Sequence, residues 1–177
     1  MKMWCDPEPG SFCDVLDILL PGLKFVTPDQ IPQPYQQLLV HDGDITAVLR
    51  DYWNHPIHLL TLRVTHEPGS LYRQVLVRTD EERVVGFGAS RIYLERLRGL
   101  AHQDVLGCYQ TLGAILEKHG ISYQSRPSEY LTIVSDESLD LSLELPEGTL
   151  LYGRLNNLIT PEGETIGETL EILPPTA

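Results

Sequence analysis

An arginine stands among apolar residues in the stretch 71–77, which reads Leu-Tyr-Arg-Gln-Val-Leu-Val. Apolar and polar residues alternate there, which predicts a β-strand with Leu71, Arg73, Val75 and Val77 on one face. A guanidinium keeps its charge in proteins and is rarely buried without a partner. Arg73 therefore pairs with an internal carboxylate, or reaches solvent at a sheet edge, or offers its planar fork to the carboxylate of a ligand.

Motifs for phosphate, metal or nucleophile chemistry are absent from the sequence. It has no phosphate loop, no dinucleotide-binding fingerprint, no His-Glu-x-x-His and no serine in a nucleophile elbow. Cys5 and Cys13 are too far apart for a zinc knuckle and lack a second pair, and His55 and His58 are more typical of an exposed turn than of half a metal site. We therefore expect neither a metal nor a cofactor, and any catalysis would use positioned polar groups.

The composition indicates one acidic globular domain. The chain has 177 residues and a net charge of −12, with ten arginines against three lysines. Nucleic acids and anionic membranes bind basic surfaces, so we expect neither as a partner. Three cysteines, the lack of a secretory signal and the lack of an apolar run near the ~20 residues of a membrane span indicate a cytoplasmic protein. An acidic protein still binds an anion, but only in a locally basic pocket.

Periodicity and turn residues predict an α+β fold, a single domain in which helices pack on an antiparallel β-sheet of about six to seven strands. Residues 1–34 are rich in Pro, Gly and Asp and predict a partly irregular arm, whereas residues 35–177 form the domain. Asp44 is a typical N-cap for the second helix, and Gly86 and Gly88 mark a bulge or a close backbone approach. The predicted helices are 35–40, 45–53, 92–100 and 109–119, and the predicted strands are 57–64, 71–78, 83–89, 121–124, 130–134, 139–145, 150–159 and 165–173.

Five stretches, taken in order, resemble the chorismate lyase family. They are Leu-Leu-Val-His-Asp-Gly-Asp-Ile-Thr (38–46), Leu-Tyr-Arg-Gln-Val-Leu (71–76), Ala-Ser-Arg (89–91), Val-Leu-Gly-Cys-Tyr (105–109), and Gly-Arg (153–154) followed by Ile-Gly-Glu-Thr-Leu (166–170). No single stretch is specific, so their order and spacing carry the resemblance, which covers residues 35–174. The first 34 residues have no counterpart in the family, and residues 124–148 are longer and more acidic than its pattern.

The resemblance implies a highly connected antiparallel sheet with a ligand buried under helical flaps. It also implies chorismate lyase activity, a cofactor-independent elimination of pyruvate from chorismate that gives 4-hydroxybenzoate for quinone biosynthesis. Aromatisation of the ring supplies much of the driving force. The partners would be the small-molecule substrate and product, and the protein would be a monomer or a weak dimer.

The same resemblance implies which residues form the site. Arg73 would bind one substrate carboxylate and serve catalysis, and Arg91 would meet the other carboxylate or the ether side. Glu168, kept protonated by a pKa that burial raises, would donate a proton to the departing ether oxygen. Glu171 lies three residues further on, points to the opposite face of the strand and is the second candidate for the pocket carboxylate. The rest of the lining would come from Leu106, Gly107 and Ile45.

Two alternatives to the lyase stay open at this point. A non-catalytic domain of the same fold would bind a small aromatic acid, as in transcription regulators that carry a separate winged-helix DNA-binding domain, for which we expect no room in this chain. An interaction protein with an unrelated α+β fold would have Arg73 paired internally. The lyase requires Arg73 and Glu168 to face one buried cavity, and it is wrong if they face opposite sides of the sheet.

Overall fold

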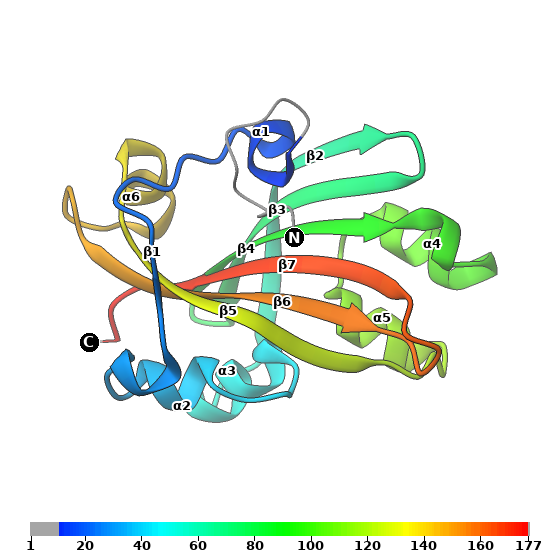
Figure 1. The fold of residues 1–177 in the computed structure, drawn as a ribbon, viewed down its shortest axis with the longest axis horizontal. Helices are drawn as coiled ribbons and strands as arrows, with labels where there is room; N and C mark the ends of the chain where they lie inside the picture. The colour runs from blue at the N-terminus through cyan, green and yellow to red at the C-terminus, as the bar shows by residue number, and fades with distance from the viewer. Residues whose placement is uncertain (1–10, 177) are drawn as a thin grey trace.

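The computed structural model describes residues 11–176, which form a seven-stranded antiparallel sheet with the strand order β1-β5-β6-β7-β4-β3-β2 (Figure 1). The strands are β1 (Lys24–Val26), β2 (Ile57–Glu67), β3 (Ser70–Thr79), β4 (Val84–Tyr93), β5 (Gln124–Val134), β6 (Leu150–Ile159) and β7 (Thr165–Leu173). The helices are α1 (Phe12–Leu16), α2 (Tyr35–Leu39), α3 (Ile45–Trp53), α4 (Gly99–Gly107), α5 (Leu112–Lys118) and α6 (Glu137–Leu143), with short 3-10 turns η1 (Pro28–Gln30) and η2 (Leu94–Arg96). Cys5 and the first ten residues of the predicted arm lie outside the described part of the chain. The predicted α+β class is confirmed.

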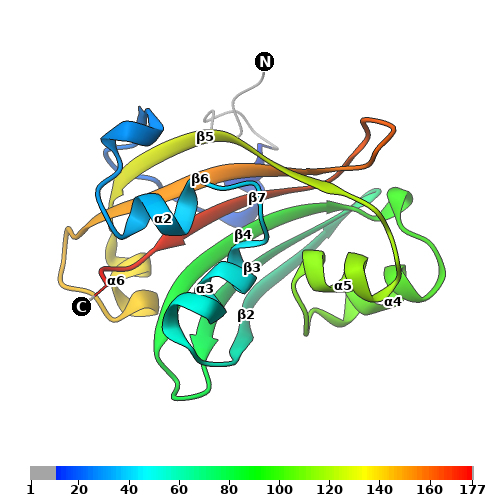
Figure 2. The ribbon, with the colours of Figure 1, turned by 90° about the horizontal axis from the view of Figure 1, so that it is seen from below.

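Helices cover both faces of the sheet, so its central strands are buried on two sides. On one face, α1 and α6 place Phe12, Leu16, Leu139 and Leu143 against apolar side chains of the strands. On the other face, α4 and α5 cover one apolar cluster and α2 and α3 cover a second. Figure 2 shows these two helix pairs at opposite ends of that face. We call the face under α2 to α5 the helix-pair face.

The register of three central strands decides which side chains share this face. Arg73 on β3 lies opposite Ser90 on β4, and Ser90 lies opposite Thr169 on β7. Side chains alternate along a strand, so these three residues point to one side of the sheet and their immediate neighbours point to the other. Arg73 is 3% exposed, which confirms its predicted place on an inner face.

Helix α3 begins and ends where its residue types predict. The Asp44 side chain accepts a hydrogen bond from the Ala47 amide at 2.9 Å, and so caps the free N–H groups of the first turn. Asn54 ends the helix in the left-handed region with φ 54°. The cap fixes the position of Ile45, at the first turn of α3, against the sheet.

Three predicted elements are wrong. Most of the predicted strand 139–145 lies in helix α6, which ends at Leu143, because Asp136 caps the Leu139 amide and the alternating leucines include Leu141, which is 76% exposed. The predicted helix 92–100 is the end of β4, the turn η2 and the start of α4. The predicted strand 121–124 is wrong, because β5 begins only at Gln124. The predicted strand 130–134 is confirmed as the second part of β5, which a β-bulge interrupts after Pro127. The first two errors concern short segments in which helix and strand periods overlap.

Candidate ligand-binding site

A cavity of about 80 Å³ lies between the helix-pair face and the helices α3 and α5. Much of its wall is apolar, and the polar groups on it are few. Strand β4 leaves space on this face because Gly86 and Gly88 carry no side chain. A Cβ at Gly88 would lie 3.1 Å from the Val75 side chain, so even a methyl group would fill part of the floor. This volume holds a few waters, and it is below the range of about 300–1,000 Å³ that is usual for ligand pockets.

Arg73 is a buried cation in the wall of this cavity. Its Nε donates to Ser90 Oγ at 3.3 Å and its Nη1 donates to the Gln110 carbonyl at 2.9 Å. Within residues 11–176 it has no carboxylate at ion-pair distance. Burial lowers the pKa of Arg73, and the neighbouring Cys108 thiol acts in the opposite direction. An arginine stays protonated in proteins, so the cavity wall carries a positive charge that no carboxylate of residues 11–176 balances.

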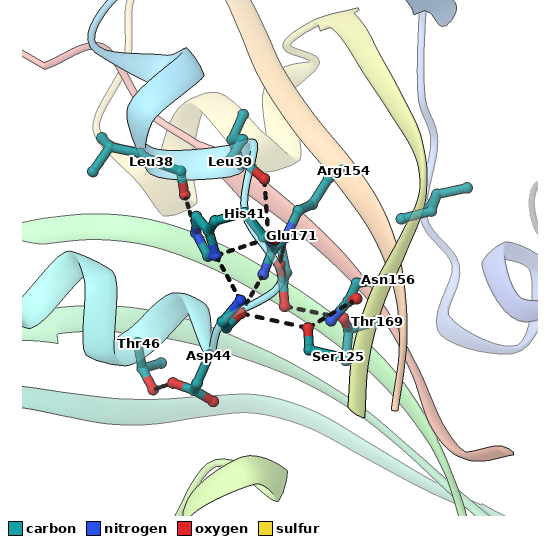
Figure 3. Close-up of polar contacts among 12 residues, drawn as sticks. Leu38, Leu39, His41, Asp44, Thr46, Ser125, Arg154, Asn156, Thr169 and Glu171 are labelled. Atoms are coloured by element: carbon teal, nitrogen blue, oxygen red, sulfur yellow. Dashed lines mark hydrogen bonds and ion pairs between the residues drawn. The ribbon is translucent and has the colours of Figure 1, made fainter. Parts of the chain in front are cut away.

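Glu171 also lines the cavity, but its charge is balanced by Arg154. The fully buried Arg154 donates from Nε to Glu171, and Thr169 Oγ1 donates to the other Glu171 oxygen at 3.0 Å. This pair joins β6 and β7 behind the cavity wall (Figure 3). A buried ion pair is tolerated only when its remaining donors are satisfied, and those of Arg154 are.

Arg154 also holds the loop between α2 and α3 on the sheet. It donates to the carbonyls of Leu39 at 2.9 Å, His41 at 2.8 Å and Gly43 at 3.2 Å. His41 Nε2 lies 2.9 Å from the Leu38 carbonyl, and its Nδ1 accepts from the Gly43 amide at 3.1 Å, which fits the neutral ring. Burial is the main cause that lowers the pKa of His41, and the positive charge of Arg154 lowers it further. The network therefore positions Asp44 and the first turn of α3 over the cavity.

Glu168 does not meet Arg73 in the cavity. It lies opposite Arg91 in the sheet, and Arg91 lies opposite Tyr72, so these three side chains point away from the helix-pair face. Tyr93 Oη donates to Glu168 at 3.0 Å. Burial raises the pKa of Glu168 despite that bond and the nearby Arg91. The carboxylate on the cavity side of β7 is Glu171, so the sequence-based choice between the two acids selected the wrong face.

Arg91 belongs to this second cluster and not to the cavity. Its guanidinium lies 4.6 Å from the Tyr93 ring centre and 5.4 Å from that of Tyr72. Its Nε is 3.4 Å from Ser70 Oγ. Such stacking on aromatic faces satisfies a half-buried cation within the protein.

Of the remaining predicted lining residues, only Ile45 contacts the cavity. Leu106 is 41% exposed, and it and Gly107 form the last turn of α4. The next residues reach the site instead, because Gln110 supplies the carbonyl to Arg73 and Thr111 caps α5 at the cavity wall. Arg154 and His41 were missed as supports of the site, since their role depends on contacts between distant parts of the chain. The Gly-Arg pair at 153–154 was the one signal for Arg154.

No protein-family model matches the chain, and no curated protein matches it in sequence. Solved structures do match its fold. PhnF from Mycobacterium smegmatis aligns with a TM-score of 0.62 and 12% identity over 77% of this chain and 65% of that chain. The effector domain of PhnF aligns with a TM-score of 0.61 and 13% identity, over 74% of this chain and 88% of the domain. The chain shares the fold of the PhnF effector domain.

Another solved structure also matches the fold of this chain at low sequence identity. The ligand-binding domain of a protein described as a GntR-family transcriptional regulator, from Bordetella bronchiseptica, aligns with a TM-score of 0.52 and 10% identity over 68% of this chain and 86% of that domain. Identities this low show a shared fold alone. This chain spans slightly less than two thirds of the whole PhnF chain, and nearly all of its effector domain.

These matches correct the enzyme prediction. The assignment to the chorismate lyases, with its lyase activity, its chorismate substrate and its role in quinone biosynthesis, is wrong, because the matched structures include an effector domain and domains of transcription regulators. The geometry agrees, since Arg73 and Glu168 lie on opposite faces of the sheet. Among residues 11–176, no helix is both long enough and apolar enough to cross a membrane.

Proposed function

We propose that this chain is a non-catalytic ligand-binding domain that holds a small organic acid, of the aromatic-acid class, in the cavity under α3 and α5. The observation that carries the proposal is Arg73. It is 3% exposed and lines the cavity, and no acidic partner is found for it in the described part of the chain. Keeping a charge in such a place costs several kcal/mol unless an opposite charge meets it.

A carboxylate ligand would supply the negative charge that no described side chain places beside Arg73. A guanidinium binds a carboxylate through two parallel hydrogen bonds, and Ser90 Oγ stands next to it to orient the fork. The apolar walls, which include Val75, Leu112 and Leu173, suit a ring or a short hydrocarbon body. Glu171 is held in its ion pair with Arg154, which supports binding over proton transfer.

The structural neighbours support a sensing role for such a domain. One is named as the effector domain of PhnF, and another is named as the ligand-binding domain of a transcription regulator. The net charge of −12 argues that nucleic acid is not bound by this domain itself. A cytoplasmic location is part of the proposal, and the free Cys108 thiol is consistent with a reducing compartment.

Calorimetric titration with benzoate and 4-hydroxybenzoate tests the proposal. Benzamide is the control ligand, because it has nearly the shape of benzoate but carries no charge. We expect both acids to bind and benzamide to bind at least about 100-fold more weakly, because the amide cannot neutralise Arg73. Arg73→Met should abolish the difference between acid and amide. Arg98→Met, at an exposed arginine, is the matched control and should bind as the wild type does. Equal binding of acid and amide, or undiminished acid binding by Arg73→Met, would overturn the proposal.

A further inference from the structure

Three ionised side chains line the cavity, and two of their charges have no partner of opposite sign among residues 11–176. Glu171 is neutralised by Arg154 behind the wall. Arg73 remains as a positive charge on the strand side, and Asp44 remains as a negative charge on the helix side. The described salt bridges include neither Arg73 nor Asp44. A ligand that fills the cavity therefore meets charges of opposite sign at two places on its wall.

The Asp44 carboxylate has one oxygen committed to the fold and one that is not. Oδ1 accepts from the Ala47 amide at 2.9 Å and from the Thr46 hydroxyl. No hydrogen bond to Oδ2 is seen within residues 11–176. A Cβ built on Gly113 would lie 2.4 Å from Oδ2 and 2.9 Å from the Tyr123 hydroxyl, so only glycine lets the first turn of α5 pass so close to this oxygen. Figure 3 shows the carboxylate turned away from Glu171 and toward Thr46.

Asp44 stands at the entrance of the cavity. Two outer grooves adjoin the cavity, one beside Tyr123 and Ser125 and the other beside Arg50 and Tyr109. Asp44 is the one residue that lines both grooves and the cavity, and Glu117 lines both grooves. A group of the ligand that extends from the cavity into either groove therefore has Asp44 in its wall.

The entrance is electrostatically negative. The pKa of Tyr123 is raised to about 12, mainly by burial and then by the negative charges of Asp44 and Glu117. Two arginines line the grooves: Arg50 is exposed and pairs with Asp51 at 3.1 Å, and Arg126 donates to Gln124 at 2.7 Å. With a net charge of −12, the whole protein also repels a simple anion. A ligand whose own charges cancel escapes this repulsion.

We propose that the cavity selects a zwitterion, an amino-substituted carboxylic acid whose carboxylate binds Arg73, whose apolar body lies on the sheet, and whose ammonium group binds Asp44 at the entrance. This inference rests on the proposed function, because it needs the carboxylate to bind Arg73. It adds a second anchoring residue and fixes the class of ligand. Asp44 then has two roles, as the cap of α3 and as the acceptor for the ligand's ammonium group.

The test compares 4-(aminomethyl)benzoate with 4-(hydroxymethyl)benzoate by calorimetric titration. The two probes have nearly the same shape and both donate a hydrogen bond, but only the first carries the ammonium charge. We expect the amine to bind about tenfold more tightly to the wild type, which is the ordinary gain from a charge-assisted hydrogen bond. Asp44→Asn should bind both probes equally, with the affinity of the wild type for the hydroxymethyl compound. Asparagine caps a helix as well as aspartate does, so α3 should remain folded, which the melting temperature checks.

The outcomes separate this inference from the function on which it rests. Equal affinity of the two probes for the wild type overturns the zwitterion while leaving the anion-binding domain intact. A preference for the amine that persists in Asp44→Asn also overturns it, because the ammonium group then binds elsewhere. Failure of both probes to bind overturns both proposals. Glu162→Gln, in the exposed turn between β6 and β7, is the control for a general loss of negative charge and should keep the tenfold preference.

Discussion

The Arg73 guanidinium and the Glu168 carboxylate lie on opposite faces of the sheet, although only β4 separates their strands. Arg73 is in register with Ser90 and Thr169, whereas Glu168 is in register with Arg91. One ligand in one cavity cannot contact both side chains. Arg73, the candidate anion-binding residue, lies on the helix-pair face. On the other face, Glu168, Arg91 and the tyrosines Tyr72 and Tyr93 contact one another.

Replacing Glu168 should therefore leave ligand binding unchanged. We expect Glu168→Gln to bind benzoate within about twofold of the wild type, because the side chain lies across the sheet from the cavity. Calorimetric titration measures this. A loss of about tenfold or more would mean that the two faces are coupled and that the site has been placed wrongly.

The same variant should change how stability depends on pH. Burial raises the pKa of Glu168 above its ordinary value of 4.5, so the folded state binds this proton more tightly than the unfolded state does. The wild type then loses stability as the pH rises through and above 4.5, and Glu168→Gln, which cannot ionise, lacks this loss. Urea unfolding at several pH values should show Glu168→Gln gaining on the wild type as the pH increases. A constant difference across the range would contradict the assignment.

Arg73→Met should not weaken the unliganded protein. The substitution removes a buried charge that no carboxylate of the described residues balances, and it costs the bonds to Ser90 and to the Gln110 carbonyl and the interaction with Cys108. We expect the free energy of unfolding to rise by about 1 kcal/mol, since a fitting apolar side chain replaces an uncompensated ion. Arg73→Lys keeps a charge and should show no gain. A loss of about 3 kcal/mol in Arg73→Met would indicate that Arg73 is paired within the fold.

Glu171→Gln should be strongly destabilising, in contrast to Arg73→Met. It leaves Arg154 fully buried with no opposite charge, and such broken pairs cost about 3–5 kcal/mol. Chemical denaturation measures the loss, with the exposed Glu162→Gln as a control that should stay within about 0.5 kcal/mol of the wild type. The double variant Arg154→Met with Glu171→Leu should recover part of the loss. If Glu171→Gln proves neutral, the pair does not hold β6, β7 and the α2–α3 loop together.

His41 should make the protein less stable in mild acid. Burial and the neighbouring Arg154 lower the pKa of His41 below its ordinary 6.5, so the unfolded state takes up this proton first. Stability should therefore fall as the pH drops below 6.5, with a slope of at most about 1.4 kcal/mol per pH unit from this residue. His41→Gln should reduce the slope, whereas His66→Gln, at an exposed site on β2, should not. Equal slopes for all three proteins would show that His41 is not in the neutral, buried state.

The fold and one half of the site could be predicted from the sequence because they depend on local patterns. Strand alternation placed Arg73 inside, and the capping residue Asp44 fixed the start of α3. The sequence could not predict that Arg73 has no carboxylate partner among the described residues. This depends on the register of β3, β4 and β7, which decides which side chains share a face with Arg73. The choice between Glu168 and Glu171 failed for the same reason. The spacing in the chorismate lyase family favoured Glu168. To decide which of the two acids lies on the same face as Arg73, one must know how β3 and β7 pair with β4.

The most direct test is a crystal structure of the protein with 4-hydroxybenzoate bound. We expect the carboxylate in the cavity, about 2.8 Å from the Arg73 guanidinium, with the ring between the sheet and α3. A ligand carboxylate bound elsewhere, such as at Arg91 on the other face, or an Arg73 side chain that does not contact it, would contradict the central claim.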